Sequence, residues 1–288
     1  MHVPVLLREM LQYLSPQNGG VYVDATFGGG GYASAILDSA DCKVIGIDRD
    51  PDAIARGEKL KSEKYGDRLT LIQSTFCSID QVILEPVDGL VFDYGVSSFQ
   101  LDEADRGFSF MRDGPLDMRM SKTGLTAAEV VNTYSEKDLA DIIFHYGDEP
   151  FSRSIARAIV QDRVEQPYET TLQLAGLIRR VVKRKDSIDA ATKTFQALRI
   201  FVNNELIEIR DALQQSLKIL KSGAHLVGVT FHSLEDRLLK RFLIDNTFQI
   251  LTKPLAPSRA EILENSRSRS AKLRAGIYTP QTHIGGDF

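Results

Sequence analysis

The chain has 288 residues, of which 43% are hydrophobic and 26% charged, and its formal net charge is −4. This composition is typical of a globular protein with room for a full core and an inserted domain, and it excludes a largely disordered chain or a generic basic coat for nucleic acid. No apolar run approaches the roughly 20 residues that cross a bilayer, and no cleavable leader is visible, so we expect a cytoplasmic protein without a membrane partner. Cys42 and Cys77 match no metal-site spacing, and we expect no bound metal.

Strand-like and helix-like segments alternate over the first hundred residues. The β-branched and apolar runs predict strands at 20–26, 43–48, 69–73 and 88–95. The segments at 32–40 and 51–64 are helical in pattern. This alternation predicts an α/β fold with a parallel sheet, right-handed crossovers and helices on both faces.

Beyond about Glu103 the pattern becomes helical. Helices are expected at 126–134, 135–147, 150–164, 170–185 and 192–223, the last with Leu220 in its apolar stripe. Ser135 with Asp138 resembles a capping box. A strand at 224–231 and a helix from Leu234 return to the earlier pattern. We therefore expect a helical insertion at 104–207 within an α/β domain made of 1–103 and 208–288, the latter with a basic tail.

Acidic residues and a glycine run follow the predicted strands. Asp24 and the glycines 28–31 follow the first strand, Asp48 the second and Asp93 the fourth. Ligands of open parallel sheets bind beyond the carboxyl ends of the strands, and an acid about 20 residues after the first glycine suits a ribose. Four consecutive glycines suggest a ligand that approaches the backbone closely. The pattern indicates a cofactor that contains a nucleoside.

Two cofactors fit this pattern to different degrees. Gly28, Gly30 and Ala33 match the spacing of a dinucleotide fingerprint, which keeps an NAD-dependent oxidoreductase open. Asp24 and Asp93 would repel a pyrophosphate, whereas they suit the ammonium and sulfonium charges of S-adenosylmethionine. We therefore favour a methyl donor.

Asp93 is the candidate catalytic residue. The exocyclic amine of a nucleobase is a poor nucleophile because its lone pair is delocalised into the ring, and an acceptor for its N–H bonds localises that pair. His232, at the end of the strand at 224–231, is a candidate substrate contact. Ser233 with Asp236 fits the cap of the following helix.

Basic residues gather in two segments, 179–199 and 265–274, of an otherwise acidic chain. Two such runs favour an anionic polymer as the partner. The candidate substrate-binding residues in these segments are Lys193, Arg199, Arg267, Arg269, Lys272 and Arg274.

Nine separated blocks carry a resemblance to one family. In chain order they are "HVPVLL", "DATFGGGG", "IDRDP", "DYGVSSFQLD", "RGFSF", "DGPLDMRM", "TFQALRI", "FHSLEDR" and "SRSAKLR". Together they resemble the bacterial ribosomal RNA small subunit methyltransferase H family, also known as MraW-like. The resemblance implies a class I S-adenosylmethionine-dependent methyltransferase sheet, Rossmann-like in form, with a helical insertion that recognises substrate. It also implies methylation of a cytidine N4 amine in the decoding region of 16S ribosomal RNA, within the small subunit or a late assembly intermediate, and it leaves a homodimer open.

Cofactor contacts follow from the same resemblance. Carried over block by block, they fall on Gly30, Gly31, Tyr32, Asp48, Phe76, Asp93 and Gln100. The chain departs from the family pattern at Tyr32, where histidine is usual, at Tyr94, where leucine is usual, and at Phe99, where proline is usual. Tyr32 keeps its backbone N–H for the cofactor, but Phe99 leaves the loop before Gln100 less constrained. A protein that binds RNA or assists ribosome assembly without turnover is a third alternative.

Overall fold

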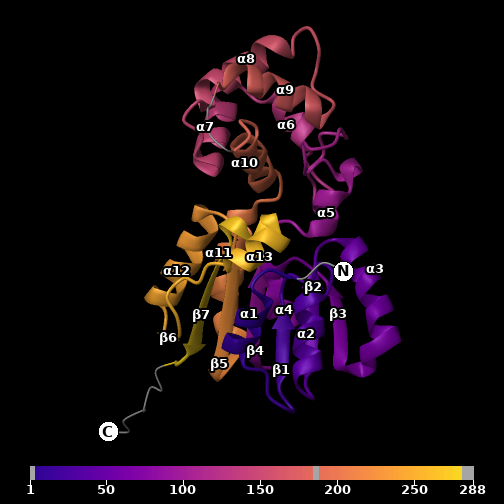
Figure 1. Cartoon of the computed structure of the whole chain (residues 1–288), viewed down its shortest axis with the longest axis vertical. Helices are drawn as coiled ribbons and strands as arrows, with labels where there is room; N and C mark the ends of the chain where they lie inside the picture. The colour runs from indigo at the N-terminus through magenta and orange to yellow at the C-terminus, as the bar shows by residue number, and fades with distance from the viewer. Residues whose placement is uncertain (1–3, 184–187, 281–288) are drawn as a thin grey trace. The chain divides into compact units, whose positions relative to one another are not determined.

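The chain forms two compact units (Figure 1). The computed structural model describes residues 4–183 and 188–280, so Arg184 and Lys185 of the first basic segment lie outside the described residues. The first unit is built from Met1–Gly95 and Leu206–Phe288, and the second is Val96–Glu205. The loop at 96–103, which we expected to belong to the α/β domain, groups with the helical unit instead.

Within the described residues, the first unit holds a seven-stranded sheet in the order β3-β2-β1-β4-β5-β7-β6. The first five strands run parallel, and β7 runs antiparallel to both β5 and β6. This confirms the predicted α/β class and adds two strands that were not predicted. The strands are β1 (Val21–Asp24), β2 (Lys43–Asp48), β3 (Leu69–Gln73), β4 (Val87–Asp93), β5 (Leu220–Thr230), β6 (Phe248–Ile250) and β7 (Lys272–Tyr278).

The strand order reverses between β1 and β4. The chain passes from β1 outward to β2 and β3, and then returns to place β4 on the other side of β1. Ligand sites of open α/β sheets lie beyond the carboxyl ends of the strands at such a reversal. The ends of β1 and β4 therefore define where a site is expected.

Helices cover both faces of the sheet (Figure 1). Neighbouring residues of a strand point to opposite faces, and Val91 packs with Met10 and Ile36 while Leu90 packs with Leu213 and Leu239. Because both faces are buried, the central strands are continuous apolar runs. None of the helices in the described part of the chain is long and apolar enough to span a bilayer. The helices are α1 (Leu7–Leu14), α2 (Gly31–Ser39), α3 (Pro51–Leu60), α4 (Ile79–Val82), α11 (Glu205–Ile219), α12 (Ser233–Asp245) and α13 (Arg259–Glu264).

The second unit is helical and has its own hydrophobic core, in which Leu139, Ile155 and Leu174 are fully buried. Side-chain caps fix where its helices begin: Ser135 accepts a hydrogen bond from the N of Asp138 at 3.1 Å, as the sequence predicts. Capping boxes begin three other helices of this unit. The helices are α5 (Ser98–Asp102), α6 (Ala127–Thr133), α7 (Glu136–Gly147), α8 (Ser152–Asp162), α9 (Thr171–Val181) and α10 (Thr192–Val202).

The long helix expected at 192–223 is broken. The side-chain amide of Asn203 accepts from the N of Met120 at 2.9 Å and donates to the O of Met118 at 2.8 Å, and Asn204 adopts a left-handed φ of 52°. A left-handed residue cannot continue a right-handed helix, so α10 ends and α11 begins here. Leu220, expected in the helical stripe, is the first residue of β5.

The segment expected to be a basic tail is ordered. Ser266–Ser270 forms a 3-10 helix, and β7 lies between β5 and β6. Leu273 and Ala275 of β7 are fully buried and alternate with the more exposed Lys272 and Arg274. This alternation is that of a strand with one face in the core, and it was hidden by the charges around it.

Candidate active site

Three carboxylates lie at the carboxyl ends of neighbouring strands in the first unit. Asp24 ends β1, Asp48 ends β2 and Asp93 ends β4. Because β1 lies between β2 and β4 and all three run parallel, these acids share one edge of the sheet. The structure thus brings Asp48 and Asp93 together, with Asp24 between them.

Asp24 is almost completely buried, with 1% of its surface exposed. Its Oδ1 accepts a hydrogen bond from the N of Thr26 at 3.2 Å, and its Oδ2 accepts one from the N of Ala33 at 3.1 Å. Burial raises the pKa of Asp24 to about 7 despite these hydrogen bonds, and the charge of Asp48 adds to the rise. Sequence reasoning used Asp24 only to compare cofactors, because nothing in the sequence shows how deeply it is buried.

Asp93 combines burial with an unsatisfied oxygen. Its N donates to the Oγ1 of Thr26 at 2.6 Å, while its Oδ1 is buried and has no hydrogen-bond partner among the described residues. Burial raises the pKa of Asp93 well above its ordinary value, and the charges of Asp24 and Glu235 raise it further. A buried oxygen without a partner costs a protein about 1–3 kcal/mol, so we expect a ligand to supply that partner.

The glycine run turns the chain sharply between β1 and α2. Gly28 and Gly30 have positive φ values of 53° and 73°. A Cβ on Gly30 would lie 2.7 Å from the Cζ of Phe27, and a Cβ on Gly31 would collide with the ring of Pro4. The protein's own side chains therefore already exclude a larger residue at these two positions, and the close approach of a ligand to this backbone stays a prediction.

The start of α2 leaves backbone donors at the same edge of the sheet. The N of Gly30 donates to the O of Phe27 at 2.7 Å, whereas the N–H groups of Gly31 and Tyr32 have no hydrogen-bond partner in the described part of the chain. The first N–H groups of a helix have no acceptor within the helix, so these two are suited to a ligand. The Tyr32 ring is buried and its hydroxyl donates to the O of Val5, which leaves Tyr32 only its backbone for cofactor contact.

Two backbone N–H groups hold the carboxylate of Asp48, one from the loop after β1 and one from the turn after β2. Its Oδ2 accepts from the N of Gly28 at 2.7 Å, and its Oδ1 accepts from the N of Asp50 at 2.8 Å. Burial raises the pKa of Asp48 in spite of these bonds. Each oxygen keeps a further lone pair, so the carboxylate is oriented and still able to accept from a ribose diol.

Phe76 belongs to an aromatic cluster beside β4. It follows β3 in a 3-10 helix, and its ring lies edge-on to Phe92 at 6.2 Å and to Tyr94 at 6.3 Å between centroids. Phe92 and Tyr94 stack at 5.2 Å. Tyr94, where the family usually has leucine, therefore supports Phe76, which is the ring expected to lie against adenine.

Gln100 has a structural role in the second unit. Its Oε1 accepts from the N of Ser97 at 3.1 Å, and its own N donates to the Oγ of Ser97 at 3.2 Å, which makes a capping box at the start of α5. Phe99 is 43% exposed. The prediction that Gln100 contacts the cofactor stays a prediction, and its Oε1 already accepts a backbone N–H.

Two basic residues expected to bind substrate are paired with an acid. Arg274 donates to both oxygens of Asp236 at 2.7 and 3.1 Å, and the Nζ of Lys272 lies 3.7 Å from the same carboxylate. The Arg274 and Asp236 side chains are each 13% exposed. Arg274 therefore holds α12 against β7, and its assignment to substrate phosphate stays a prediction.

The remaining basic candidates differ in how exposed they are. Arg199 donates to both oxygens of Glu205 at 2.8 and 2.9 Å, so its charge is matched within the helical region. The Nζ of Lys193 donates to the O of Asp148 at 2.8 Å near the end of α7. Arg267 and Arg269 are exposed on the 3-10 helix that precedes β7, and they are the most accessible of these cations.

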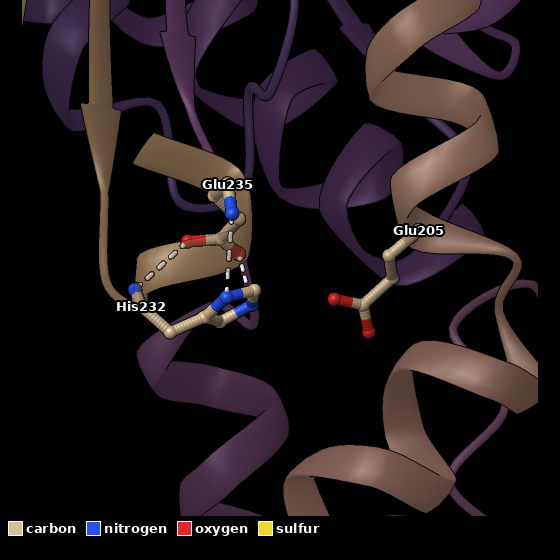
Figure 2. Close-up of side chains that lie close together, drawn as sticks. All are labelled: Glu205, His232 and Glu235. Atoms are coloured by element: carbon tan, nitrogen blue, oxygen red, sulfur yellow. Dashed lines mark hydrogen bonds and ion pairs between the residues drawn. The ribbon is translucent and has the colours of Figure 1, made fainter. Parts of the chain in front are cut away.

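His232 begins helix α12, where Figure 2 shows it beside Glu235. Its Nδ1 accepts from the N of Glu235 at 3.4 Å, and the Oε2 of Glu235 accepts from the N of Phe231 and of His232 at 2.7 and 3.2 Å. The predicted cap of Ser233 with Asp236 is wrong, because the pair is displaced by one residue. Glu235 is fully buried. The sequence analysis did not single it out, because Ser233 with Asp236 fits the same capping pattern one residue later.

The charges at this edge of the sheet fit a cationic cofactor. In the described part of the chain, none of the groups that shift the pKa of Asp24 or Asp93 is a cation. A pyrophosphate would add negative charge beside two buried carboxylates, whereas a sulfonium would stabilise their ionised forms. The carboxylates of Asp24 and Asp93 therefore fit S-adenosylmethionine and disfavour a dinucleotide.

Comparison with known proteins agrees with this chemistry. The MraW methylase family model matches residues 1–277. A protein of Nitrobacter winogradskyi named ribosomal RNA small subunit methyltransferase H is 53% identical, over 98% of this chain and 92% of that protein. A protein of the same name from Bradyrhizobium diazoefficiens is 51% identical, over 96% of this chain and 92% of that protein. This chain belongs to the MraW methylase family of S-adenosylmethionine-dependent methyltransferases.

Proposed function

We propose that this protein transfers the methyl group of S-adenosylmethionine to the exocyclic N4 amine of one cytidine in the decoding region of 16S ribosomal RNA. The observation that carries the proposal is the carboxylate of Asp93, which ends β4 with one oxygen buried and unpartnered among the described residues. The names of the relatives support ribosomal RNA of the small subunit as the substrate. The nine sequence blocks support the cytosine amine as the acceptor.

The cofactor would be held by residues that follow three strands. Asp48 would accept from the ribose hydroxyls, Phe76 would lie along the adenine, and the N–H groups of Gly31 and Tyr32 would bind the methionine carboxylate. When bound, S-adenosylmethionine supplies a methyl group on a positively charged sulfur. Asp24, which is buried between β2 and β4, would contribute the charge that complements the sulfur.

Asp93 would act on the acceptor amine. Its unpartnered oxygen would accept a hydrogen bond from N4–H, and this draws the amine lone pair out of the ring as the bond to carbon forms. The strand end and the hydrogen bond from the N of Asp93 to Thr26 hold the carboxylate in place, so little reorganisation is needed. The target cytidine would be unstacked from its neighbours to reach this position.

Cofactor binding distinguishes this proposal from the NAD-dependent alternative. We expect S-adenosylmethionine and S-adenosylhomocysteine to raise the melting temperature, by several degrees at 100 times the Kd. NAD at the same concentration is expected to produce no shift, because its pyrophosphate would lie beside Asp24 and Asp93. A comparison of the three ligands by differential scanning fluorimetry measures this. A shift with NAD alone would restore the oxidoreductase alternative.

The exposed arginines before β7 are expected to contact phosphate. Replacing Arg267 and Arg269 together with alanine should weaken RNA binding and reduce the slope of log K against log salt by about 1.5, because two contacts are lost. Titration of labelled RNA at several salt concentrations measures the slope. Lys59→Ala, an exposed cation on α3, is the matched control and should leave the slope unchanged. An unchanged slope in the double variant contradicts the assignment.

The form of the RNA substrate can be tested directly. We propose that the protein acts in the cytoplasm on the small subunit or on a late assembly intermediate. Labelled S-adenosylmethionine should therefore label both particles, prepared from cells without a related enzyme, in preference to naked 16S RNA. Label in naked RNA alone would contradict the proposal that the substrate is an assembled particle.

Binding to the particles with no label in any form would favour the alternative that the protein is an assembly factor. Sedimentation of the free protein tests whether it forms a homodimer.

A further inference from the structure

The chain bulges away from β7 just after β6, which is the last strand at one edge of the sheet (Figure 1). The N of Leu251 donates to the O of Ala275 at 3.0 Å, and the N of Leu255 donates to the O of Leu273 at 3.0 Å. The segment 251–255 therefore faces only 273–275, so the residues between the two hydrogen bonds are displaced from the strand. Pro254, in the displaced part, has no N–H with which to rejoin it.

This bulge and helix α12 line a groove of about 400 Å³, a volume within the range of ligand sites. Much of its lining is apolar, and two of these side chains, Ile244 and Ile250, are 61% and 47% exposed. Large apolar side chains that are exposed together mark a binding surface. Three cations also line the groove, Lys240, Lys253 and Arg274, and none of the described residues that line it is acidic.

The positive charge continues along α12. Arg237, Lys240 and Arg241 lie on one exposed face of the helix and form no ion pair with any described residue. Arg274 is bound by Asp236 and so belongs to the fixed wall of the groove. Lys240 and Lys253 are thus the two cations of the groove whose charge is open to an anion.

We propose that this groove binds one unstacked nucleotide of single-stranded RNA, with its base against Leu243 and Ile250 and the adjoining phosphates at Lys240 and Lys253. Sites for single strands combine cations that follow the backbone with apolar surfaces that cover the faces of bases. A second copy of this chain suits the groove less well, because a symmetric contact would bring the cations of both copies together.

The choice of RNA as the occupant rests on the proposed function, whereas the groove lies apart from Asp93. In the sheet, β5 and β7 lie between β6 and β4, the strand that ends at Asp93. Contacts in the groove hold the RNA equally before and during methyl transfer. They therefore lower the KM for the RNA substrate and leave the rate at saturation unchanged.

The test measures the affinity of the full chain for a fluorescein-labelled single-stranded RNA with the decoding-region sequence, by anisotropy at several salt concentrations. Lys240→Ala combined with Lys253→Ala should reduce the slope of log K against log salt by about 1.4, because each phosphate contact on a single strand contributes about 0.7. Ile250→Glu should weaken binding about tenfold or more, since it replaces an apolar surface for the base with a charge that repels phosphate.

Lys43→Ala combined with Lys59→Ala is the matched control. It removes two exposed cations from β2 and α3, in the half of the sheet that ends with β3, and should keep both the slope and the affinity. An unchanged slope in the Lys240 and Lys253 variant, or an unchanged affinity in Ile250→Glu, would overturn the inference. Altered sedimentation with unaltered RNA affinity would assign the groove to a second copy and would overturn it as well.

Methyl transfer to small subunits separates this test from that of the proposed function. The variant at Lys240 and Lys253 should keep the rate at saturating subunits and raise the KM, and a lower rate with the original KM would contradict an anchoring role. All variants should keep the thermal shift with S-adenosylmethionine, because no expected cofactor contact lines the groove. If the unsubstituted protein methylates no cytidine N4, the proposed function fails, but the RNA affinities still decide whether the groove binds a single strand.

Discussion

Replacing Asp93 with asparagine will lower the rate of methyl transfer at saturating cofactor and RNA by about 10²–10⁴-fold, the range that a positioned acid or base contributes. The amide can still accept one hydrogen bond from the amine, but it carries no charge and cannot accept the proton. The buried Oδ1 of Asp93 makes this loss large, because a charge-assisted hydrogen bond is stronger where water is excluded. Single-turnover transfer of label to small subunits measures the rate.

Two controls separate this effect from misfolding. Asp88→Asn removes a carboxylate from the same strand and is expected to keep the rate within about twofold, since surface changes away from a site have small effects. Thermal shift with S-adenosylmethionine shows whether Asp93→Asn still folds and binds cofactor. A variant that binds both ligands and transfers methyl at the original rate would remove Asp93 from the mechanism.

Asp24→Asn will make the stability of the cofactor-free protein less dependent on pH. Asp24 has a pKa of about 7 in the folded chain against an ordinary value of 3.8, so the folded state holds more protons between these values. The free energy of unfolding therefore falls as pH rises through this window, by up to about 1.4 kcal/mol per pH unit, and Asp24 contributes no further change above it. Over the whole window this amounts to a loss on the order of 4 kcal/mol, which the asparagine variant should avoid.

Urea unfolding at several pH values, without cofactor, measures this difference. The stability of Asp24→Asn relative to the unsubstituted protein should rise between about pH 4 and 7 and then level off. Asp88 is the opposite case: burial alone would raise its pKa, but the hydrogen bond from Lys221 outweighs this and holds the pKa below its ordinary value. Asp88→Asn should therefore lose stability at neutral pH. Parallel curves for Asp24→Asn and the unsubstituted protein would show that Asp24 is ionised throughout.

Local patterns in the sequence predicted the sheet and the acids at its edge. The strands that carry Asp24, Asp48 and Asp93 are apolar runs flanked by turns, and a parallel sheet fixes which ends of such runs meet. The cap at Ser135 was equally visible, because its partner lies three residues away. Features set by neighbours within a few residues could thus be predicted.

Features set by distant residues could not be predicted. Arg274 looked like a free cation because Asp236, which holds it, lies 38 residues away in the sequence. The break before α11 depends on hydrogen bonds between Asn203 and the backbone near Met118, and these exist only in the folded chain. The burial of Asp24 likewise depends on the helices that cover the sheet, which are distant in the sequence.

The glycine run combines a feature that the sequence predicts with one that depends on distant residues. Its position between a predicted strand and a predicted helix is confirmed, and the positive φ of Gly28 and Gly30 turns the chain there. The reason for glycine at 30 and 31 was internal packing against Phe27 and Pro4, two residues whose positions no local pattern gives. The turn still delivers the N–H groups at the start of α2 to the edge of the sheet where Asp24 and Asp93 lie.

The most direct test of this account is the chemical position of the transferred methyl group. Small subunits from cells without a related enzyme would be incubated with the protein and S-adenosylmethionine, and their RNA digested to nucleosides and to fragments for mass spectrometry. We expect one methyl group, on the exocyclic N4 of a single decoding-region cytidine, and none with Asp93→Asn over the same time. A methyl group on a ring carbon, on a ribose or on another base would contradict it.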